Sequence, residues 1–188
     1  MNVPTTLDGR EVLLAVTGGI ACYKAAALAS QLTQAGAGVT VAMTDGSQRF
    51  VTPLTFQSLT ARPVYTSLWA AIERYDAQHI ALVDRAAAMV IAPATANIIG
   101  KMAAGIADDL VSTLAMTAMA STPILLAPAM NTSMWNNPVV LGNVTRLTEL
   151  GVDTIGPNEG RLACGTVGAG RMAEPDEIFG AIVALLTE

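Results

Sequence analysis

Short apolar runs recur along this chain, each only a few residues long, rich in aliphatic side chains and followed by residues typical of turns. Runs of this kind predict β-strands that are buried on both faces. We expect four such strands, and a fifth that is less clearly marked, at residues 12–16, 39–43, 89–92, 124–127 and 153–155.

Longer segments with helical spacing lie between these strands. They cover residues 20–35, 53–59, 79–86, 98–118, 138–150 and 176–186, and the fourth is interrupted near Gly105. This alternation predicts an α/β fold: a doubly wound, Rossmann-like or flavodoxin-like parallel sheet with helices on both faces. The length of 188 residues fits a single domain, residues 1–188.

The loops that follow the predicted strands combine small residues with hydroxyl or amide side chains. Because ligands of doubly wound sheets bind beside the carboxyl ends of the strands, these loops are where we expect the functional site. They cover residues 17–19, 44–47, 93–97 and 128–131. A further segment, 157–175, is rich in glycine and lacks an apolar period, which predicts a long binding loop.

Charged residues make up only 13% of the chain, whereas 52% of its residues are hydrophobic. Typical domains have a charged share of roughly a quarter. We therefore expect part of the surface to be buried between subunits of a homo-oligomer. The alternative is a surface covered largely by Ala and Gly.

Composition also argues against several classes of protein. The net charge of -5 and the few Lys and Arg residues give no basic stripe for nucleic acid. No run of about 18 apolar residues and no basic leader segment is present, which predicts a soluble, cytoplasmic protein with no membrane partner. Cys22, Cys164 and the single His79 do not form a metal-binding set.

The turn Thr17-Gly18-Gly19 leads from the first predicted strand into the first predicted helix, so backbone N–H groups and the helix dipole would face an anion there. It lacks the dinucleotide fingerprint GxGxxG, because Ile20 and Tyr23 stand where the second and third glycines belong. Thr44 and Ser47 follow the neighbouring strand, where their hydroxyls could reach the same phosphate. The two loops indicate a mononucleotide; the alternative is a tight turn without a ligand.

Three further residues could carry chemistry, and each also has an ordinary structural role. The pKa of histidine suits His79 to acid–base work, although a lone histidine is more often a structural residue. The amide of Asn131 could hold a carboxylate or cap the turn that follows it. Cys164 lies in the glycine-rich segment and could be delivered to a substrate, or it could be incidental. Cys22, among apolar residues of a helix, is expected to pack in the core.

Six segments in order resemble one known family, the homo-oligomeric flavin-containing cysteine decarboxylases. They are TGGIACYK (17–24), HIAL (79–82), APATAN (92–97), GIADDL (105–110), PAMN through MW (128–135), and LACG through GRMAEP (162–175). Each segment alone is a weak signal, whereas six in order are specific. The resemblance extends over nearly the whole chain.

The resemblance implies FMN as the cofactor and a role for each matching residue. The FMN phosphate would be held by Gly18, Gly19, Ile20, Thr44 and Ser47. The flavin would be lined by Thr95, Ala96, Asn97, Ile98 and Ala129. His79 matches the active-site histidine, Asn131 the residue that binds the substrate carboxylate, and Cys164 the proton donor on a substrate clamp, residues 157–175. Substrate would also touch Arg161, Ala163 and Met172.

The activity implied is decarboxylation of 4'-phosphopantothenoylcysteine to 4'-phosphopantetheine, a carboxy-lyase step of coenzyme A biosynthesis. The resemblance also implies homotrimers, or dodecamers built from them, with flavin sites at subunit interfaces. One alternative is a peptidyl-cysteine decarboxylase of antibiotic maturation, and another is a non-catalytic FMN-binding regulatory protein.

Two features depart from the family pattern. Arg85-Ala86-Ala87 stand where the family continues toward Trp-Ala-Asp, so a local contact or a subunit interface is expected to differ. Bacterial relatives often carry a C-terminal synthetase domain, and we expect that step to belong to another polypeptide unless this sequence is part of a longer chain.

Overall fold

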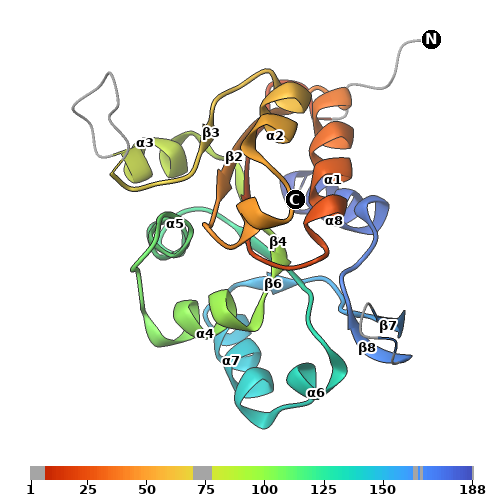
Figure 1. Ribbon diagram of the computed structural model, residues 1–188. Helices are drawn as coiled ribbons and strands as arrows, with labels where there is room; N and C mark the ends of the chain where they lie inside the picture. The colour runs from red at the N-terminus through yellow and green to blue at the C-terminus, as the bar shows by residue number, and fades with distance from the viewer. Residues whose placement is uncertain (1–6, 70–77, 163–164, 166, 188) are drawn as a thin grey trace.

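Six parallel strands form the main sheet of this computed structural model, which describes residues 7–69, 78–162, 165 and 167–187 (Figure 1). Across the sheet they are β3 (Val64–Tyr65), β2 (Gly38–Met43), β1 (Glu11–Val16), β4 (Ala88–Ala94), β5 (Ile124–Pro128) and β6 (Asp153–Thr154). The chain builds outward from β1 to β3 on one side and then returns to add β4, β5 and β6 on the other. The predicted doubly wound parallel sheet is confirmed.

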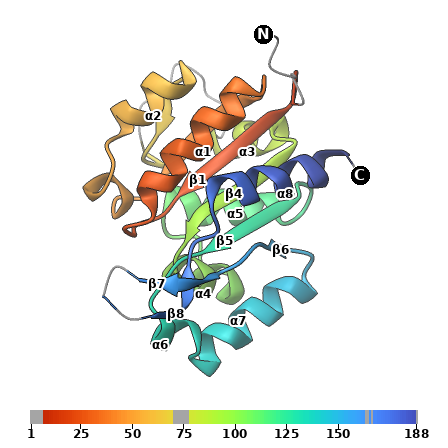
Figure 2. The same ribbon diagram turned by 90° about the vertical axis from the view of Figure 1, so that its right-hand side faces the viewer.

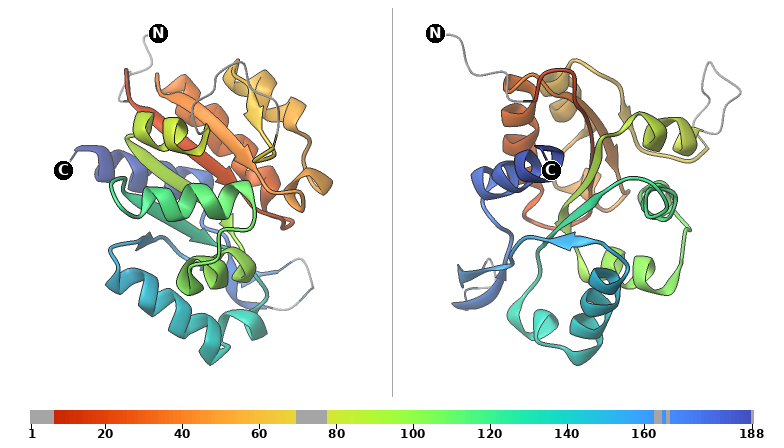
Figure 3. Two further views of the ribbon diagram at one scale, coloured as in Figure 1. Left: turned by 90° about the vertical axis from the view of Figure 1, so that its left-hand side faces the viewer. Right: turned by 180° about the vertical axis from the view of Figure 1, so that it is seen from behind.

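Helices cover both faces of this sheet. On one face lie α1 (Cys22–Gln34), α2 (Pro53–Thr60) and α8 (Pro175–Thr187). On the other lie α3 (Gln78–Arg85), α4 (Ala96–Ala104), α5 (Leu110–Ala118) and α7 (Pro138–Glu149). Figure 2 is seen from the side of α1 and α8, and the left view of Figure 3 shows the opposite face.

Strand β1 shows why the apolar runs are continuous. Val12, Leu14 and Val16 belong to the core under α1 and α8, whereas Leu13 and Ala15 belong to the core under α3 to α5. Successive side chains of a strand point to opposite faces, so a strand covered on both sides needs an apolar residue at every position. Each large aliphatic side chain buried here contributes about 1.5–3 kcal/mol to folding.

The expected helices all form, and the segment 98–118 is divided as predicted. α4 ends at Ala104, and Gly105 caps it with a left-handed backbone (φ 73°), a conformation that glycine adopts without a steric penalty. A short 3-10 turn, η1 (Ser47–Arg49), and a four-residue helix, α6 (Thr132–Trp135), were not predicted, nor was the two-residue strand β3.

The prediction of a loop throughout 157–175 is wrong in part. Residues Asn158–Arg161 (β7) and Val167–Arg171 (β8) pair as an antiparallel hairpin outside the main sheet. Gly160 lies opposite Gly168 in this hairpin. Glycines in the strands remove the apolar alternation by which a strand is recognised, which explains the error.

Candidate functional site

A cavity of about 1290 Å³ opens at the carboxyl ends of the strands, where the chain order reverses between β1 and β4. Doubly wound sheets bind their ligands at this switch point. The cavity is lined by most of the residues predicted for the site: Gly18, Gly19, Ile20, Thr44, Thr95, Ala96, Asn97, Ile98, Ala129, Asn131, Arg161 and Met172. The fold therefore brings together segments that lie far apart in the sequence.

The turn after β1 presents backbone donors to this cavity. α1 has no side-chain hydrogen bond at its N-cap, Ala21. Within the described residues, the N–H groups of Gly18, Gly19 and Ile20 have no protein acceptor. Unpaired N–H groups at the start of a long helix attract an anion. This turn therefore fits a phosphate group.

Glycine at position 18 is required by a close approach between two turns. A Cβ atom added to Gly18 would lie 2.8 Å from the carbonyl carbon of Gly46. The turn after β1 and the turn after β2 therefore touch backbone to backbone. A side chain at position 18 would force the two turns apart.

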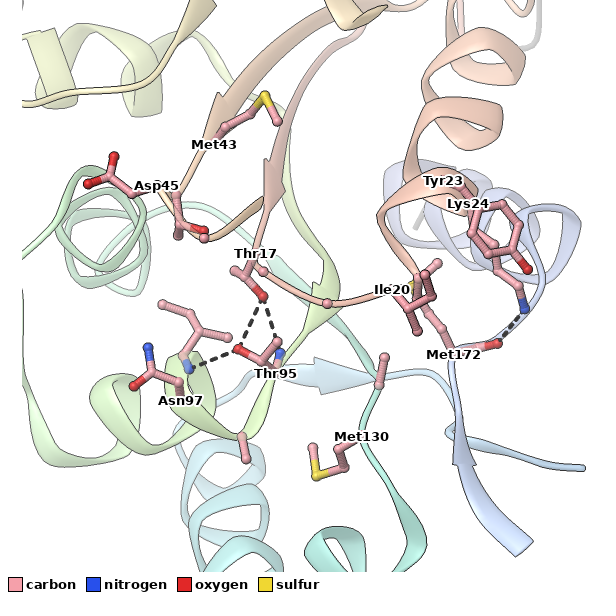
Figure 4. A pocket seen from close by; sticks show the side chains of 18 of the residues that line it. Thr17, Ile20, Tyr23, Lys24, Met43, Asp45, Thr95, Asn97, Met130 and Met172 are labelled. Carbon is pink, nitrogen blue, oxygen red and sulfur yellow. Dashed lines mark hydrogen bonds between the residues drawn. The ribbon is translucent and has the colours of Figure 1, made fainter. Parts of the chain in front are cut away.

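The loops after β1 and β4 are joined by hydroxyl groups (Figure 4). The Thr17 hydroxyl donates to the Pro93 carbonyl over 2.6 Å and lies 3.2 Å from the Thr95 hydroxyl. The Thr95 backbone N–H donates to Thr17 Oγ1 over 3.3 Å, and Thr95 Oγ1 caps α4 by accepting from the Ile98 N–H. Thr17 is buried and lines the cavity; its loop was predicted to form part of the site, but the residue itself was given no role.

The turn after β2 places its two predicted hydroxyls differently. Thr44 lines the cavity. Ser47 is fully buried, is not among the lining residues, and donates its hydroxyl to the Thr44 carbonyl over 2.7 Å. The Ser47 hydroxyl is therefore bonded to the backbone of its own turn. Asp45 also lines the cavity (Figure 4).

Asn131 follows β5 and begins α6. Its Oδ1 accepts from the Met134 N–H over 2.9 Å, which is the capping role considered from the sequence. Because the cap uses the oxygen of the amide, the NH2 group remains able to donate a hydrogen bond. Asn131 lines the cavity, and a donor there suits a carboxylate. Capping and ligand binding are therefore compatible in this residue.

The β7–β8 hairpin packs closely on the Asn131 turn. The Met130 N–H donates to the Gly170 carbonyl over 2.9 Å, and a Cβ atom on Gly170 would collide with the Met130 carbonyl oxygen. A Cβ atom on Gly168 would lie 2.7 Å from Thr132 Oγ1. The hairpin also contributes Arg161, and Met172 follows β8, so it forms one wall of the cavity.

His79 lies in the first turn of α3, is partly exposed, and, like Ser47, is not among the residues that line the cavity. Ala163 and Cys164 lie outside the described residues, next to Leu162 and Gly165, which do line it.

The corner between α4 and α5 adds a charged cluster that was not predicted. Lys101 Nζ lies 2.6 Å from a carboxylate oxygen of Asp108 and 2.6 Å from one of Asp109, and both carboxylates line the cavity. Asp109 also caps α5 in a reciprocal pair of hydrogen bonds with Ser112. The motif GIADDL was noted in the sequence, but its partner Lys101 lies seven and eight residues earlier, on another helix.

Burial and hydrogen bonding act against each other in this cluster. Burial alone raises the pKa of the Asp109 carboxyl, but hydrogen bonds from Lys101 and Ser112 outweigh it and leave the pKa below its ordinary 3.8. Burial alone lowers the pKa of Lys101, but the carboxylates of Asp108 and Asp109 bring it above 10.5. Both charges are therefore stabilised by the fold.

Within the part of the chain that the structure describes, none of the helices has the length and apolar character needed to cross a membrane. The same part contains no group of three or more His, Cys, Asp or Glu side chains placed to hold a metal ion.

Comparisons of the sequence and of the structure with known proteins point to the same family. The coenzyme A biosynthesis bifunctional protein CoaBC of Bacillus subtilis is 50% identical over 172 residues, which cover 92% of this chain and 42% of that protein. This chain thus spans less than half the length of that relative. The probable phosphopantothenoylcysteine decarboxylase of Streptococcus mutans is 41% identical over 170 residues, which cover 90% of this chain and 95% of the relative.

A solved structure of a PPC decarboxylase mutant complexed with pantothenoylaminoethenethiol has a TM-score of 0.85 and 34% identity, covering 95% of this chain and 99% of that chain. A family model described as Flavoprotein matches residues 1–187. Since this match covers nearly the whole chain, the chain belongs to the flavoprotein family.

Proposed function

We propose that this chain is a carboxy-lyase that uses FMN to decarboxylate 4'-phosphopantothenoylcysteine to 4'-phosphopantetheine, in the biosynthesis of coenzyme A. One observation carries the proposal: the cavity joins an open phosphate-binding turn at Gly18 to an amide donor at Asn131 beside a hairpin wall. The similarity to a probable phosphopantothenoylcysteine decarboxylase over almost its full length supports this substrate.

The cavity fits a mononucleotide and a second ligand together. Pockets for one small molecule usually measure about 300–1000 Å³, and this cavity is larger, at about 1290 Å³. The backbone N–H groups of Gly18, Gly19 and Ile20 would hold the FMN phosphate, with Thr44 beside them. The loop of Thr95 would line the flavin, together with Ala129 from the chain segment after β5.

A bound flavin would supply the redox chemistry, since it can accept a hydride from the carbon that bears sulfur and return it later. The substrate would then be a thioaldehyde, the electron sink that a cysteinyl carboxylate lacks, and loss of CO2 would give an enethiolate. The cycle then has no net redox change and needs no added nicotinamide. The task left to the chain is to orient the carboxylate and to supply a proton.

Asn131 is suited to orient the carboxylate. Its Oδ1 is held by the Met134 N–H, so its NH2 group has a fixed direction before the substrate binds. A donor that is already in place costs little reorganisation when the substrate binds. Cys164, next to the lining residue Gly165, would supply the proton that converts the enethiolate carbon to a methylene group.

His79 would act in the site of a neighbouring subunit. It lies on α3 and is not among the residues that line the cavity of its own chain. The large exposed side chains Trp69 and Ile80, close to it in sequence, are suited to a subunit contact. A homotrimer, or a dodecamer built from trimers, with flavin sites at its interfaces would bring His79 to the carboxylate. A cytoplasmic location fits a step of intermediary biosynthesis.

The experiment that tests the proposal compares two substrates on the same FMN-loaded protein. We expect 4'-phosphopantothenoylcysteine to lose the mass of CO2, and a peptide with a C-terminal cysteine to remain unchanged, as followed by mass spectrometry. Turnover of the peptide alone would assign the chain to peptide maturation. Turnover of neither, with FMN bound, would favour a regulatory flavoprotein.

A further inference from the structure

Lys24 is a nearly buried cation that lines the cavity but that none of the proposed chemical steps uses. It lies in the first turn of α1, four residues after Ile20, and only 7% of its surface is exposed. Its Nζ donates to the Met172 carbonyl over 3.1 Å and to Glu174 Oε1 over 2.9 Å. Figure 4 shows this side chain reaching from α1 to the segment that follows β8.

The segment that Lys24 contacts is the base of the β7–β8 hairpin. Oε2 of Glu177, in α8, accepts a hydrogen bond from Asn158 Nδ2 at the start of β7 over 2.6 Å. The same atom also accepts a hydrogen bond from the Glu174 N–H over 2.7 Å. Glu177 therefore holds both ends of the hairpin against α8, and Lys24 holds the second end against α1.

The position of this base decides where the hairpin wall stands. Gly170 contacts the Asn131 turn through its hydrogen bond from Met130, and Met172 lies two residues further along the chain. A shift at Met172 is therefore transmitted to the wall that faces the substrate. The Gly18–Ile20 turn is attached to α1 itself, and its donors do not depend on the hairpin.

A buried ammonium is expensive to maintain, and well-packed apolar side chains often give equal stability in such places. Its retention here needs a reason other than stability. We propose that Lys24 is a positioning residue: through Met172 and Glu174 it fixes the substrate hairpin relative to the phosphate-binding end of α1. This inference rests on the proposed decarboxylase function and predicts an effect on substrate binding that is separate from flavin binding.

The test uses FMN-loaded Lys24→Met, which keeps the length and burial of the side chain but removes the charge and the donors. Glu174 retains its contact with Arg171 Nη2 at 3.2 Å, so its carboxylate stays paired. We expect the KM for 4'-phosphopantothenoylcysteine to rise about tenfold, which corresponds to one charged hydrogen bond. Because the inferred role of Lys24 concerns substrate binding, the kcat and the FMN dissociation constant should each change less than about twofold.

Two variants complete the design. Lys24→Arg keeps the charge and two donors and should recover most of the wild-type KM. Gln31→Ala is the matched control, because Gln31 Nε2 also ties α1 to α8, through Asp176, from a position two turns further along α1 than Lys24. Its KM should remain that of the wild type.

The outcomes separate the two proposals. Wild-type protein without turnover would overturn the decarboxylase function, and the positioning role with it. Normal wild-type turnover with an unchanged KM in Lys24→Met, or with KM and FMN affinity weakened equally, would overturn the positioning role alone. If Lys24→Met does not fold, Glu174→Gln replaces it: a rise in KM at constant FMN affinity supports the role, and an unchanged KM contradicts it.

Discussion

The hydroxyl of Thr17, directly after β1, lies 3.2 Å from the hydroxyl of Thr95, which caps α4. These residues are 78 positions apart and stand on the two sides of the switch point. Through them the turn proposed to bind phosphate and the loop proposed to line the flavin are held together. A ligand that spans both loops depends on the spacing between them, so we expect these hydroxyls to affect its binding.

Replacing Thr17 with valine tests this relationship, because valine has the same shape but neither donates to Pro93 nor accepts from the Thr95 N–H. A buried polar group left without its partner costs about 1–3 kcal/mol. We expect the FMN dissociation constant, measured by flavin fluorescence, to rise about tenfold or more. Thr17→Ser, which keeps the hydroxyl, should stay within about threefold of the wild type; equal loss in both variants would contradict the account.

Gly18→Ala should weaken FMN binding for a steric reason. Its Cβ atom would meet the Gly46 carbonyl carbon at 2.8 Å, and backbone atoms on both sides leave little room to relax. Overpacking of this kind costs about 1–3 kcal/mol, so we expect at least about a tenfold loss of FMN affinity.

Gly142→Ala is the control for this substitution. Gly142 lies within α7 and a Cβ atom there has nothing within 4 Å, so alanine should leave FMN affinity unchanged. Because alanine is the better helix former, the protein should gain about 0.5–1 kcal/mol in its free energy of unfolding. Unchanged FMN affinity in Gly18→Ala would mean that the two turns need not touch.

The architecture was predictable where one local pattern decided the structure. β1 is buried on both faces, so its sequence is uniformly apolar, and Gly105 marked the break between α4 and α5. The paired hairpin was not predictable, because Gly160 and Gly168 lie opposite each other and supply no apolar alternation. The wall of the cavity that includes Trp69 was also missed, because it follows the two-residue strand β3.

The residues of the site likewise differ in whether a local sequence pattern marks them or only a distant contact does. Gly18 and Asn131 could be singled out because each lies in a loop a few residues after an obvious strand, and both line the cavity. Lys24 and Lys101 act through partners far along the chain or on another helix, so no spacing in the sequence indicated them. Their roles depend on tertiary packing and needed the structure.

The charged corner at Asp109 predicts a pH-dependent contribution to stability. Asn at this position can still cap α5, so Asp109→Asn removes mainly the ionic contact with Lys101. Allowing for partial solvent screening, we expect it to lower the free energy of unfolding by about 1 kcal/mol near neutral pH, as measured by urea denaturation.

The sign of the pH dependence follows from the lowered pKa of Asp109. Its stabilising effect is fully present above the ordinary value of 3.8 and is lost as the pH falls through the lower value of the folded protein. The wild type and Asp109→Asn should therefore converge in stability at strongly acid pH. A difference that stayed constant down to about pH 2 would contradict this explanation.

Mixed oligomers test whether His79 serves a neighbouring subunit. His79→Asn and Asn131→Asp should each be nearly inactive alone; in Asn131→Asp the new carboxylate would keep the α6 cap while repelling the carboxylate of the substrate. When both variants are expressed together, random assembly should give wild-type sites at roughly a quarter of the interfaces of a symmetric oligomer. Recovery of activity supports a shared site, whereas no recovery would place His79 and Asn131 in the site of one chain.

FMN-dependent decarboxylation can be measured by mixing the FMN-loaded protein with 4'-phosphopantothenoylcysteine under anaerobic conditions, without nicotinamide, and following the release of CO2. We expect one CO2 for each 4'-phosphopantetheine formed over many turnovers, with the flavin spectrum oxidised at the end. Failure to release CO2 from fully FMN-loaded protein, or release only when an external oxidant is consumed, would contradict the proposed function.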